Sequence, residues 1–265
     1  MLNTKSKYCL DGVYEKDRRT LHEQIIAEIL EGSLVGNTNP ESFLVGGGSA
    51  SGKGYATRLV IDAYKSEGTR VVHIDADAIK EKLPEYKEYI SSVDREVVKQ
   101  AAMVVHDESS DITDELLDIC IKENRHFIFD GTMKNEEKYT RIISKLRKKA
   151  YRIRAFVVDI PMEVALKRAE QRFDDTDRFV PEHIIRESHK KIASTFLSIK
   201  DRVDGYALYD NTSDGNEAEQ FAFKISPEEE EQVIDRERLK QFYAKSNIDI
   251  ETVEKIQAKE NLVDL

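Results

Sequence analysis

A glycine-rich segment, Gly47-Gly48-Ser49-Ala50-Ser51-Gly52-Lys53, follows the apolar run Phe43–Val45 and precedes a helical pattern over residues 53–66. The segment matches the phosphate-binding loop pattern up to its lysine. Glycines permit a tight turn from strand to helix, backbone N–H groups then point into one concavity, and the helix N-terminus adds positive potential. We therefore predict that residues 47–54 bind a nucleotide and that Lys53 reaches the β- and γ-phosphates.

Apolar runs alternate with amphipathic stretches along the rest of the chain. The patterns predict strands at residues 42–46, 70–74, 126–129, 153–160 and 206–209. They predict helices over 14–32, 53–66 and 135–149, and a long helical region over 93–123 that is either continuous or broken near residues 106–110. Two further helices are expected to begin at Pro161 and Pro181, because proline favours helix starts. This alternation indicates an α/β fold with a mostly parallel sheet and helices on both faces.

Acidic residues stand at the ends of two predicted strands, in Asp75-Ala-Asp77 and Asp130-Gly131-Thr132. Ligands of parallel α/β sheets bind beyond the carboxyl ends of the strands, so these acids and the glycine-rich loop are expected to share one cleft. A carboxylate there orients Mg²⁺ or accepts the proton of an attacking hydroxyl. The alternatives are a helix cap for Asp77 and a turn for Asp130.

Arginines mark the segment between Pro161 and Pro181. Arg168 and Arg172 are four residues apart and share a helix face, and Arg178 follows an acidic turn. This arrangement is typical of the mobile lid of a small-molecule kinase, in which guanidinium groups neutralise charge that develops in the transition state. The alternative is a set of surface arginines paired with neighbouring acids.

Gly54 occupies the position at which the loop pattern has a serine or threonine that binds Mg²⁺. A glycine has no side chain to bind a metal. The metal is then held by Asp75, Ser49 or Ser51, directly or through water, or metal use is weakened.

The ordered motifs resemble the zeta toxin family of P-loop kinases over about residues 40–212. They are the glycine-rich loop, Ile74-Asp-Ala-Asp77, Leu83-Pro84, Phe129-Asp-Gly-Thr132, Arg168, Arg178-Phe-Val-Pro181 and Leu208-Tyr-Asp-Asn211. The resemblance implies phosphorylation of the 3′-hydroxyl of UDP-N-acetylglucosamine and related UDP-sugars with ATP or GTP and Mg²⁺. It also implies a block of cell-wall precursor synthesis and an antitoxin partner that covers the nucleotide site.

The same resemblance assigns roles to individual residues. It implies that Asp77 is the base, that Lys53 binds the phosphates, and that Arg168 and Arg178 clamp them, with Arg172 as an alternative to Arg168. The substrate contacts that it implies come from Asp75, Asp130, Thr132, Lys134 and Asp114, for which Glu115 is an alternative. Gly54, Asp130 and Lys134 depart from the family pattern, so the acceptor is open to a molecule other than UDP-N-acetylglucosamine.

The charge is uneven along the 265 residues. The net charge is −10, and residues 216–265 account for −6 of it, with 13 acidic and seven basic residues. We expect an N-terminal helical segment at 1–39, a kinase domain at 40–226 and an acidic helical tail at 227–265. The run of four glutamates at 228–231 is either a solvated face or helix start, or part of an interaction element. The tail itself is expected to dock on the core through Ile234, Leu239, Phe242 and Tyr243, with an interaction element as the alternative.

Composition excludes several other classes of protein. Two cysteines, Cys9 and Cys120, exclude a disulfide framework, and no apolar run approaches the length of a membrane span. The N-terminal residues lack the apolar centre of a signal peptide, so we expect a cytoplasmic protein. The overall acidity argues against nucleic acid as a partner.

Two other functions remain open. One is a nucleotide-binding regulatory or interaction protein with a degenerate metal site, which Gly54 suggests. The other is a nucleic-acid kinase, suggested by nine basic residues within 134–154, although that stretch lacks an array of aromatic residues for stacking.

Overall fold

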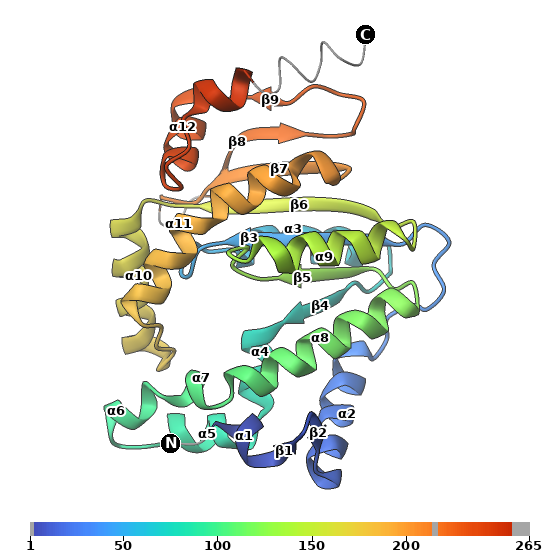
Figure 1. The fold of residues 1–265 in the computed structure, drawn as a ribbon, viewed down its shortest axis with the longest axis vertical. Helices are drawn as coiled ribbons and strands as arrows, with labels where there is room; N and C mark the ends of the chain where they lie inside the picture. The colour runs from blue at the N-terminus through green and yellow to red at the C-terminus, as the bar shows by residue number, and fades with distance from the viewer. Residues whose placement is uncertain (1–2, 214–216, 256–265) are drawn as a thin grey trace.

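The computed structural model describes residues 3–213 and 217–255, and within them a seven-stranded sheet forms the centre of the molecule (Figure 1). The strand order is β4-β5-β3-β6-β7-β8-β9. The strands are β3 (Glu41–Gly47), β4 (Val72–Asp75), β5 (Phe127–Asp130), β6 (Arg152–Asp159), β7 (Gly205–Asp210), β8 (Glu219–Lys224) and β9 (Gln232–Val233). The first five in the spatial order pair in parallel, and β8 and β9 are antiparallel. The predicted mostly parallel α/β sheet is confirmed.

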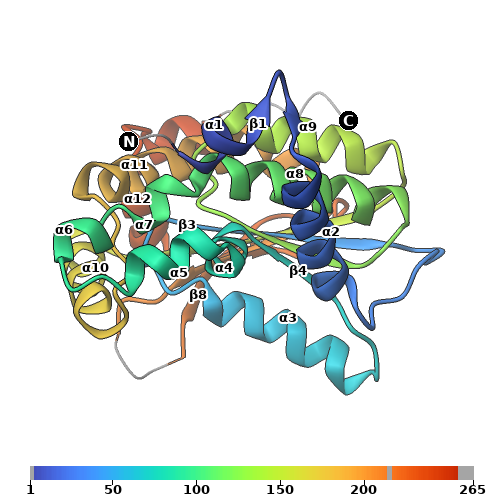
Figure 2. The same cartoon turned by 90° about the horizontal axis from the view of Figure 1, so that it is seen from below.

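Helices cover both faces of this sheet (Figure 2). One face carries α3 (Gly54–Ser66), and the other carries α8 (His106–Lys122), α9 (Glu136–Arg147) and α11 (Glu182–Ile199). The central strand β3 is apolar on both sides for this reason, as buried parallel strands are. Leu44 packs with the α9 and α11 side, and Phe43 and Val45 pack with α3.

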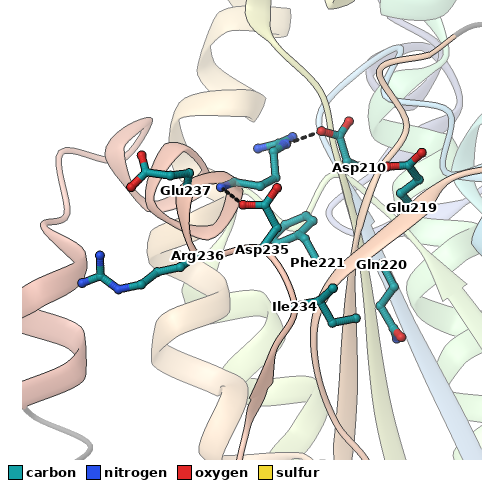
Figure 3. A pocket seen from close by; sticks show the side chains of 9 residues that line it. Asp210, Glu219, Gln220, Phe221, Ile234, Asp235, Arg236 and Glu237 are labelled. Atoms are coloured by element: carbon teal, nitrogen blue, oxygen red, sulfur yellow. Dashed lines mark hydrogen bonds and ion pairs between the residues drawn. The ribbon is translucent and has the colours of Figure 1, made fainter.

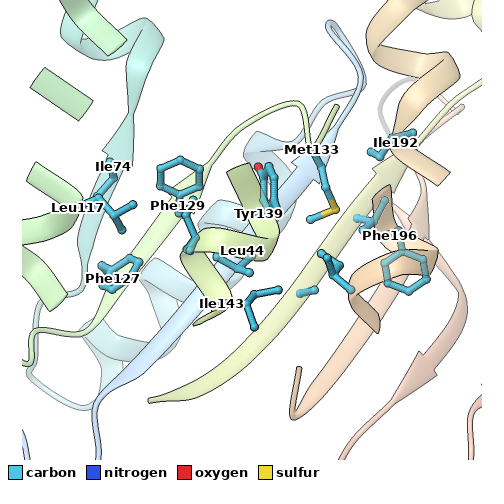
Figure 4. Close-up of a cluster of buried hydrophobic side chains, with 14 of the residues drawn as sticks. Leu44, Ile74, Leu117, Phe127, Phe129, Met133, Tyr139, Ile143, Ile192 and Phe196 are labelled. Atoms are coloured by element: carbon cyan, nitrogen blue, oxygen red, sulfur yellow. The ribbon is translucent and has the colours of Figure 1, made fainter. Parts of the chain in front are cut away.

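The larger core lies between the sheet and the helices α8, α9 and α11 (Figure 4). Leu44 of β3, Ile143 of α9 and Phe196 of α11 are fully buried in it. Burial of side chains of this size contributes roughly 1.5–3 kcal/mol each. This core fixes the strands of the sheet relative to one another, and the predicted glycine-rich loop and the acids predicted at strand ends lie at or just after the carboxyl ends of β3, β4 and β5.

The other helices cluster around the ends and edges of the sheet. Those among the described residues are α1 (Thr4–Tyr8), α2 (Lys16–Leu30), α4 (Ala76–Lys82), α5 (Pro84–Ile90), α6 (Arg95–Val98), α7 (Ala101–Val104), α10 (Met162–Thr176), α12 (Arg236–Ala244) and the 3-10 turn η1 (Lys200–Arg202). The helical region predicted over 93–123 divides into α6, α7 and α8, and its last break lies just before His106, at the start of the expected break near residues 106–110. Figure 1 shows α10 beyond the carboxyl ends of the strands.

The sequence patterns predicted the helix α2 but not the short elements that precede it, α1 and a two-stranded hairpin. The hairpin of β1 (Cys9–Leu10) and β2 (Val13–Tyr14) turns through Asp11 and Gly12, both with positive φ. Arg18 of α2 donates to Glu108 of α8 at 2.5 and 2.7 Å and to Glu85 of α5 at 2.8 and 3.1 Å. His22 Nε2 lies 2.6 Å from the fully buried Glu108.

Replacing Glu108 by Gln is expected to lower the free energy of unfolding by about 3 kcal/mol, because it removes the fully buried carboxylate that Arg18 and His22 share, although Glu85 remains as a second partner of Arg18. Burial alone would raise the pKa of Glu108, but hydrogen bonds from His22 and Arg18 lower it to about 2. The stability that this carboxylate contributes is thus present above the ordinary value of 4.5 and is lost as the pH falls toward 2. Urea unfolding at several pH values measures both effects.

The control for this prediction is Glu23→Gln on α2. Glu23 is exposed and pairs with Arg19 at 3.4 Å, so its loss should cost less than about 1 kcal/mol. Equal unfolding curves for the two variants would contradict the role given to Glu108.

The C-terminal segment packs against the core through α12. Leu239, Phe242 and Tyr243 are buried. Arg238 of this helix and Lys245 just after it each approach the fully buried Asp159 at the end of β6, at 2.7 Å. Residues 256–265 of the predicted tail lie outside the described residues.

Candidate active site

The predicted phosphate-binding loop joins β3 to α3 at the carboxyl edge of the sheet. Gly52 (φ +81°) and Ala50 (φ +62°) have left-handed backbone conformations. At Gly47 the requirement is packing, because a Cβ there would lie 2.4 Å from Ser51 Oγ and 2.6 Å from Lys53 Cγ. The absence of side chains therefore keeps the loop tight enough for its N–H groups to converge.

Two polar groups of the loop indicate a ligand. Lys53 Nζ donates to Gly47 O at 3.2 Å, so the ammonium lies across the loop. Ser51 Oγ is buried and has no hydrogen-bond partner among the described residues. Buried hydroxyls are nearly always bonded, so this one indicates a group that the loop holds when it is loaded.

The segment after β7 supports the loop from outside. Asn211 Nδ2 donates to Ser51 O at 3.0 Å. Arg168 of α10 donates in turn to Asn211 O at 2.8 Å and to Thr212 O at 3.1 Å. The structure thus places Arg168, a predicted phosphate clamp, beside the loop, with its guanidinium bonded to the backbone that follows β7.

Asp75 and Asp77 follow β4 and have different surroundings. Asp75 caps α4, because its Oδ1 accepts from Asp77 N at 2.8 Å. The cap that sequence reasoning offered as the alternative role of Asp77 therefore belongs to Asp75. Asp77 is half-exposed and accepts from Lys80 Nζ at 2.8 Å and from Arg178 Nη2 at 3.0 Å. Burial alone would raise the pKa of Asp77, but Lys80, Arg178 and Lys53 lower it, so Asp77 is ionised.

The lid arginines Arg178 and Arg172 lie together near this carboxylate. Arg178 pairs with Asp77 and also lies 3.7 Å from Glu81 Oε1. Arg172 Nε is buried without a hydrogen-bond partner among the described residues. Burial, and then Arg178, lower the pKa of Arg172. A buried guanidinium with an unbonded N–H, next to a second arginine, is suited to a polyphosphate.

Asp130 at the end of β5 lies in register with Asp75 of β4. Its Oδ2 accepts from Thr57 Oγ1 at 3.1 Å and lies 3.4 Å from His73 Nε2. Burial, and then the carboxylates of Asp130 and Asp77, raise the pKa of Asp75. The carboxylates of Asp130 and Asp77 thus influence Asp75 electrostatically, as neighbouring like charges do.

The remaining predicted substrate residues are spread over a wider area. Lys134 pairs with Glu187 of α11 at 2.8 Å, and Thr132 follows Asp130 on the same loop. Asp114 is half-exposed and pairs with Lys138 at 2.8 Å. Its alternative, Glu115, accepts from Arg19 Nη1 at 2.5 Å and so belongs to the contact with α2.

Sequence reasoning missed several groups that face Asp77. Lys80 pairs with Asp77 directly. Burial lowers the pKa of His106 at the start of α8, the charges of Lys80 and Lys134 lower it further, and Asp77 opposes this shift. Tyr86 of α5 lies near Arg178 and Asp77, although burial is the main cause of its raised pKa. Lys80 follows Asp77 at a helical interval of three, and this spacing was the one available signal.

The residues at the loop fit a magnesium ion that is bound mainly by phosphates and water. No group of three or more His, Cys, Asp or Glu that could hold a metal occurs among residues 3–213 and 217–255. Mg²⁺ usually takes one or two protein carboxylates and completes its shell with substrate phosphates and water. Asp75, with its raised pKa, and the unbonded Ser51 hydroxyl are the groups that suit this role.

A separate pocket of about 470 Å³ lies between β7, β8 and the start of α12 (Figure 3). Two arginines also line the pocket, Arg236 and Arg238, and Arg238 Nε donates to Asp210. The walls of the pocket carry four carboxylates, those of Asp210, Glu219, Asp235 and Glu237. A lining with this many carboxylates is not suited to a polyphosphate.

Comparisons with known proteins agree with the geometry. A family model described as zeta toxin matches residues 26–217. The match covers the loop, the acidic strand ends and the arginines of α10, and it leaves residues 1–25 and 218–265 outside. No helix among the described residues is long and apolar enough to cross a membrane.

Among curated proteins, the chain is similar to calmodulin calcium-dependent NAD kinase of Arabidopsis thaliana. The two are 30% identical over 120 residues, which are 43% of this chain and 22% of the plant protein. The match therefore spans about a fifth of that relative.

Two of the solved structures that are similar to this chain illustrate the likeness. One belongs to the PezAT chromosomal toxin–antitoxin system of Streptococcus pneumoniae, with a TM-score of 0.61 and 16% identity over 75% of this chain and 79% of that one. The other comes from AvrRxo1-ORF1:ORF2 with ATP, with a TM-score of 0.70 and 17% identity over 91% and 82%. At these identities the likeness shows the fold.

Proposed function

Because this chain belongs to the zeta toxin family, it is a P-loop kinase, and we propose that it transfers the γ-phosphoryl group of ATP to a sugar hydroxyl of a nucleotide-bearing small molecule. The observation that carries this proposal is the meeting of three groups from separate elements. Lys53 of the loop, Asp77 after β4 and Arg178 after α10 lie close enough for both cations to lower the pKa of the carboxylate. Phosphoryl transfer needs this combination of a phosphate cation, a base and a lid cation.

The ion pair of Asp77 with Arg178 describes the resting state. A carboxylate held by two cations is ionised but is a poor proton acceptor. When a nucleotide occupies the loop, its phosphates compete for Arg178 and draw this guanidinium away from Asp77. Asp77 is then free to accept the proton of the acceptor hydroxyl, so binding of the nucleotide activates the base.

Arg172 is the second cation for the phosphates in this proposal. Its unbonded, buried Nε supports the role, whereas Arg168 is bonded to the backbone after β7 and supports the loop. Mg²⁺, when bound with the nucleotide, supplies further neutralisation of phosphate charge, and Asp75 and Ser51 would hold it.

The acceptor is proposed to carry a diphosphate. Lys80 pairs with Asp77 at 2.8 Å, and both Lys80 and Lys134 influence His106 at the start of α8 electrostatically. UDP-sugars, which the family resemblance implies, contain a diphosphate and a free sugar hydroxyl. NAD contains the same two groups, and the similarity to the plant NAD kinase favours it as the second candidate.

A panel of acceptors with labelled ATP tests the function. The protein would be incubated with UDP-N-acetylglucosamine, other UDP-sugars, NAD and free nucleosides, with GTP as a second donor. We expect transfer to one of the diphosphate-bearing acceptors and none to free nucleosides. Normal ATP binding without transfer to any acceptor would contradict a kinase of this class.

A protein partner that covers the loop cleft is also proposed. The solved structures similar to this chain include a toxin–antitoxin system and a two-protein complex. Such a partner would exclude ATP, so its addition should abolish both nucleotide binding and transfer. A complex that still bound ATP would place the partner elsewhere.

Gly54 permits a direct test of the metal site. A Cβ at this position would meet nothing within 4 Å, so a serine fits without a shift of its neighbours. Gly54→Ser is expected to reduce the Mg²⁺ concentration for half-maximal rate several-fold, because the added hydroxyl supplies the usual metal contact. Initial rates measured against Mg²⁺ at saturating ATP give this value.

Gly54→Ala is the matched control, since it adds the same Cβ without the hydroxyl. Equal Mg²⁺ dependence in both variants would show that the metal does not approach residue 54. An inactive parent that gains activity only as Gly54→Ser would favour the alternative function, a nucleotide-binding regulator with a degenerate metal site.

A further inference from the structure

Helix α11 makes two hydrogen bonds to one residue of the loop, Ser49. Ser49 N–H donates to Ser188 Oγ at 3.1 Å, and Ser49 O lies 3.0 Å from His189 Nε2. The Ser188 hydroxyl donates to Ile185 O at 2.8 Å, which orients its lone pairs toward Ser49. Ser188 and His189 are fully buried. Both backbone polar groups of Ser49 are therefore held from outside the loop.

The imidazole of His189 also lies directly against Gly48. A Cβ on Gly48 would lie 2.3 Å from both Cδ2 and Nε2 of the ring. Gly48 does not have a positive φ, so backbone conformation does not require a glycine there. The requirement comes from His189, and any side chain at position 48 would displace the ring.

The next residue explains why such a hold is needed. Ala50 has φ +62°, a conformation that costs a non-glycine residue roughly 1 kcal/mol or more unless its surroundings impose it. Within this stretch Ser51 N–H donates to Gly48 O at 3.1 Å, whereas the N–H groups of Ala50, Gly52 and Lys53 have no acceptor among the described residues and remain available for phosphates. Fixing Ser49 therefore fixes the start of the phosphate-binding turn.

We propose that Ser188 and His189 are positioning residues that hold the phosphate-binding loop in its nucleotide-binding conformation and thereby set the affinity for ATP. The inference rests on the proposed function in one respect, namely that the loop binds ATP. The proposal assigns a role to helix α11, which lies outside the loop motif.

The chemistry of His189 fits this role in its neutral form. A proton on Nε2 is needed to donate to Ser49 O, and Nδ1 is buried without a hydrogen-bond partner among the described residues. Burial lowers the pKa of His189, Ser49 O and Asp159 oppose the shift, and Lys245 and Lys53 add to it. A second ring proton would thus be buried without an acceptor.

Packing of α11 alone does not require a histidine here. The helix is anchored in the core by apolar residues such as Ile185, Ile192 and Phe196. Ser188 and His189 direct their polar atoms to the loop. A variant that keeps the volume of His189 but not its donor therefore separates positioning from packing.

The test compares His189→Met with His189→Gln in the full chain. Methionine fills the space without a donor, whereas the glutamine amide restores an N–H near the position of Nε2. His189→Met is expected to raise the Kd for ATP about tenfold, with kcat at saturating ATP within about threefold of the parent. His189→Gln should recover most of the affinity. Ser188→Ala should weaken ATP binding several-fold, and His183→Met, at an exposed histidine of the same helix, should change nothing.

Hydrogen exchange without nucleotide provides a readout that does not depend on ATP. Amides of residues 48–53 should exchange faster in His189→Met, while those of β3 keep their protection. Unchanged exchange in the loop would overturn the inference, as would an unchanged Kd for ATP in a normally folded His189→Met. A parent protein that binds no ATP would instead overturn the proposed function, and the exchange data would still decide whether α11 holds the loop.

Discussion

Asp77→Asn is expected to reduce phosphoryl transfer by about 10²–10⁴-fold while leaving ATP binding within a few-fold of the parent. The amide keeps the size of the side chain but cannot accept the proton of the acceptor hydroxyl. The effect should appear in kcat, because in our proposal Asp77 acts on the acceptor, whereas Lys53 and the loop hold the nucleotide. Rapid-quench assays with labelled ATP, together with calorimetric ATP titration, measure the two quantities separately.

Glu81→Gln is the matched control for this prediction. Glu81 lies on the same helix, α4, and also faces Arg178, at 3.7 Å. Its loss should leave kcat within about twofold, because a partly exposed pair of this kind contributes little. If Asp77→Asn kept the parental rate, another group would have to be the base, and the proposal for this carboxylate would fail.

Arg178→Met is expected to lower kcat by about 10³-fold, the usual contribution of an arginine that stabilises the transferring phosphoryl group. Arg172→Met should have an effect of similar kind, since its unbonded Nε lies beside Arg178. Arg168→Met is expected to act mainly on the KM for ATP, because this arginine supports the backbone after β7. Steady-state kinetics at varied ATP distinguish these outcomes.

The pH profile provides a second signature of Arg178. Because Lys80, Arg178 and Lys53 lower the pKa of Asp77, kcat/KM of the parent should stay level as the pH falls from about 8 to about 5, with its acid limb below the ordinary aspartate range near 3.9. In Arg178→Met one of these cations is absent, so the pKa of Asp77 rises and the acid limb moves to higher pH.

Arg186→Met on α11 is the control for the arginine series. Arg186 is exposed and pairs with Glu182 of its own helix at 2.7 Å, so both kcat and the pH profile should stay unchanged. A large loss in Arg168→Met with a normal Arg178→Met would reverse the roles that we propose for the two arginines.

The sequence predicted the parts of this protein that depend on local pattern. Apolar runs of the length of buried strands gave the positions of β3, β5 and β6, and the glycine-rich motif between β3 and α3 predicted the loop. The acids Asp75 and Asp130 were placed at one edge because parallel strands share their carboxyl ends, and β4 and β5 align these two residues. The zeta toxin resemblance is confirmed by the family match.

The sequence pattern did not predict which residues far apart in the chain contact one another. Arg18, 90 residues from Glu108, pairs with it only because α2 packs on α8. Arg168 has the same spacing signal as Arg172, but the backbone after β7 reaches one of them and not the other. The cap of α4 also fell on Asp75 rather than Asp77, since the helix begins at Ala76, directly after β4.

Residue type and spacing thus specify the fold class, the loop and the set of charged groups near it, because strand and helix periodicity and loop motifs are properties of neighbouring residues. The partner of each charged group depends on which elements pack together. Gly48 shows the difference: its place in a loop motif is evident in the sequence, but the reason it has no side chain is His189, 141 residues further along the chain. Packing of α11 against the loop creates that requirement, and no local pattern contains it.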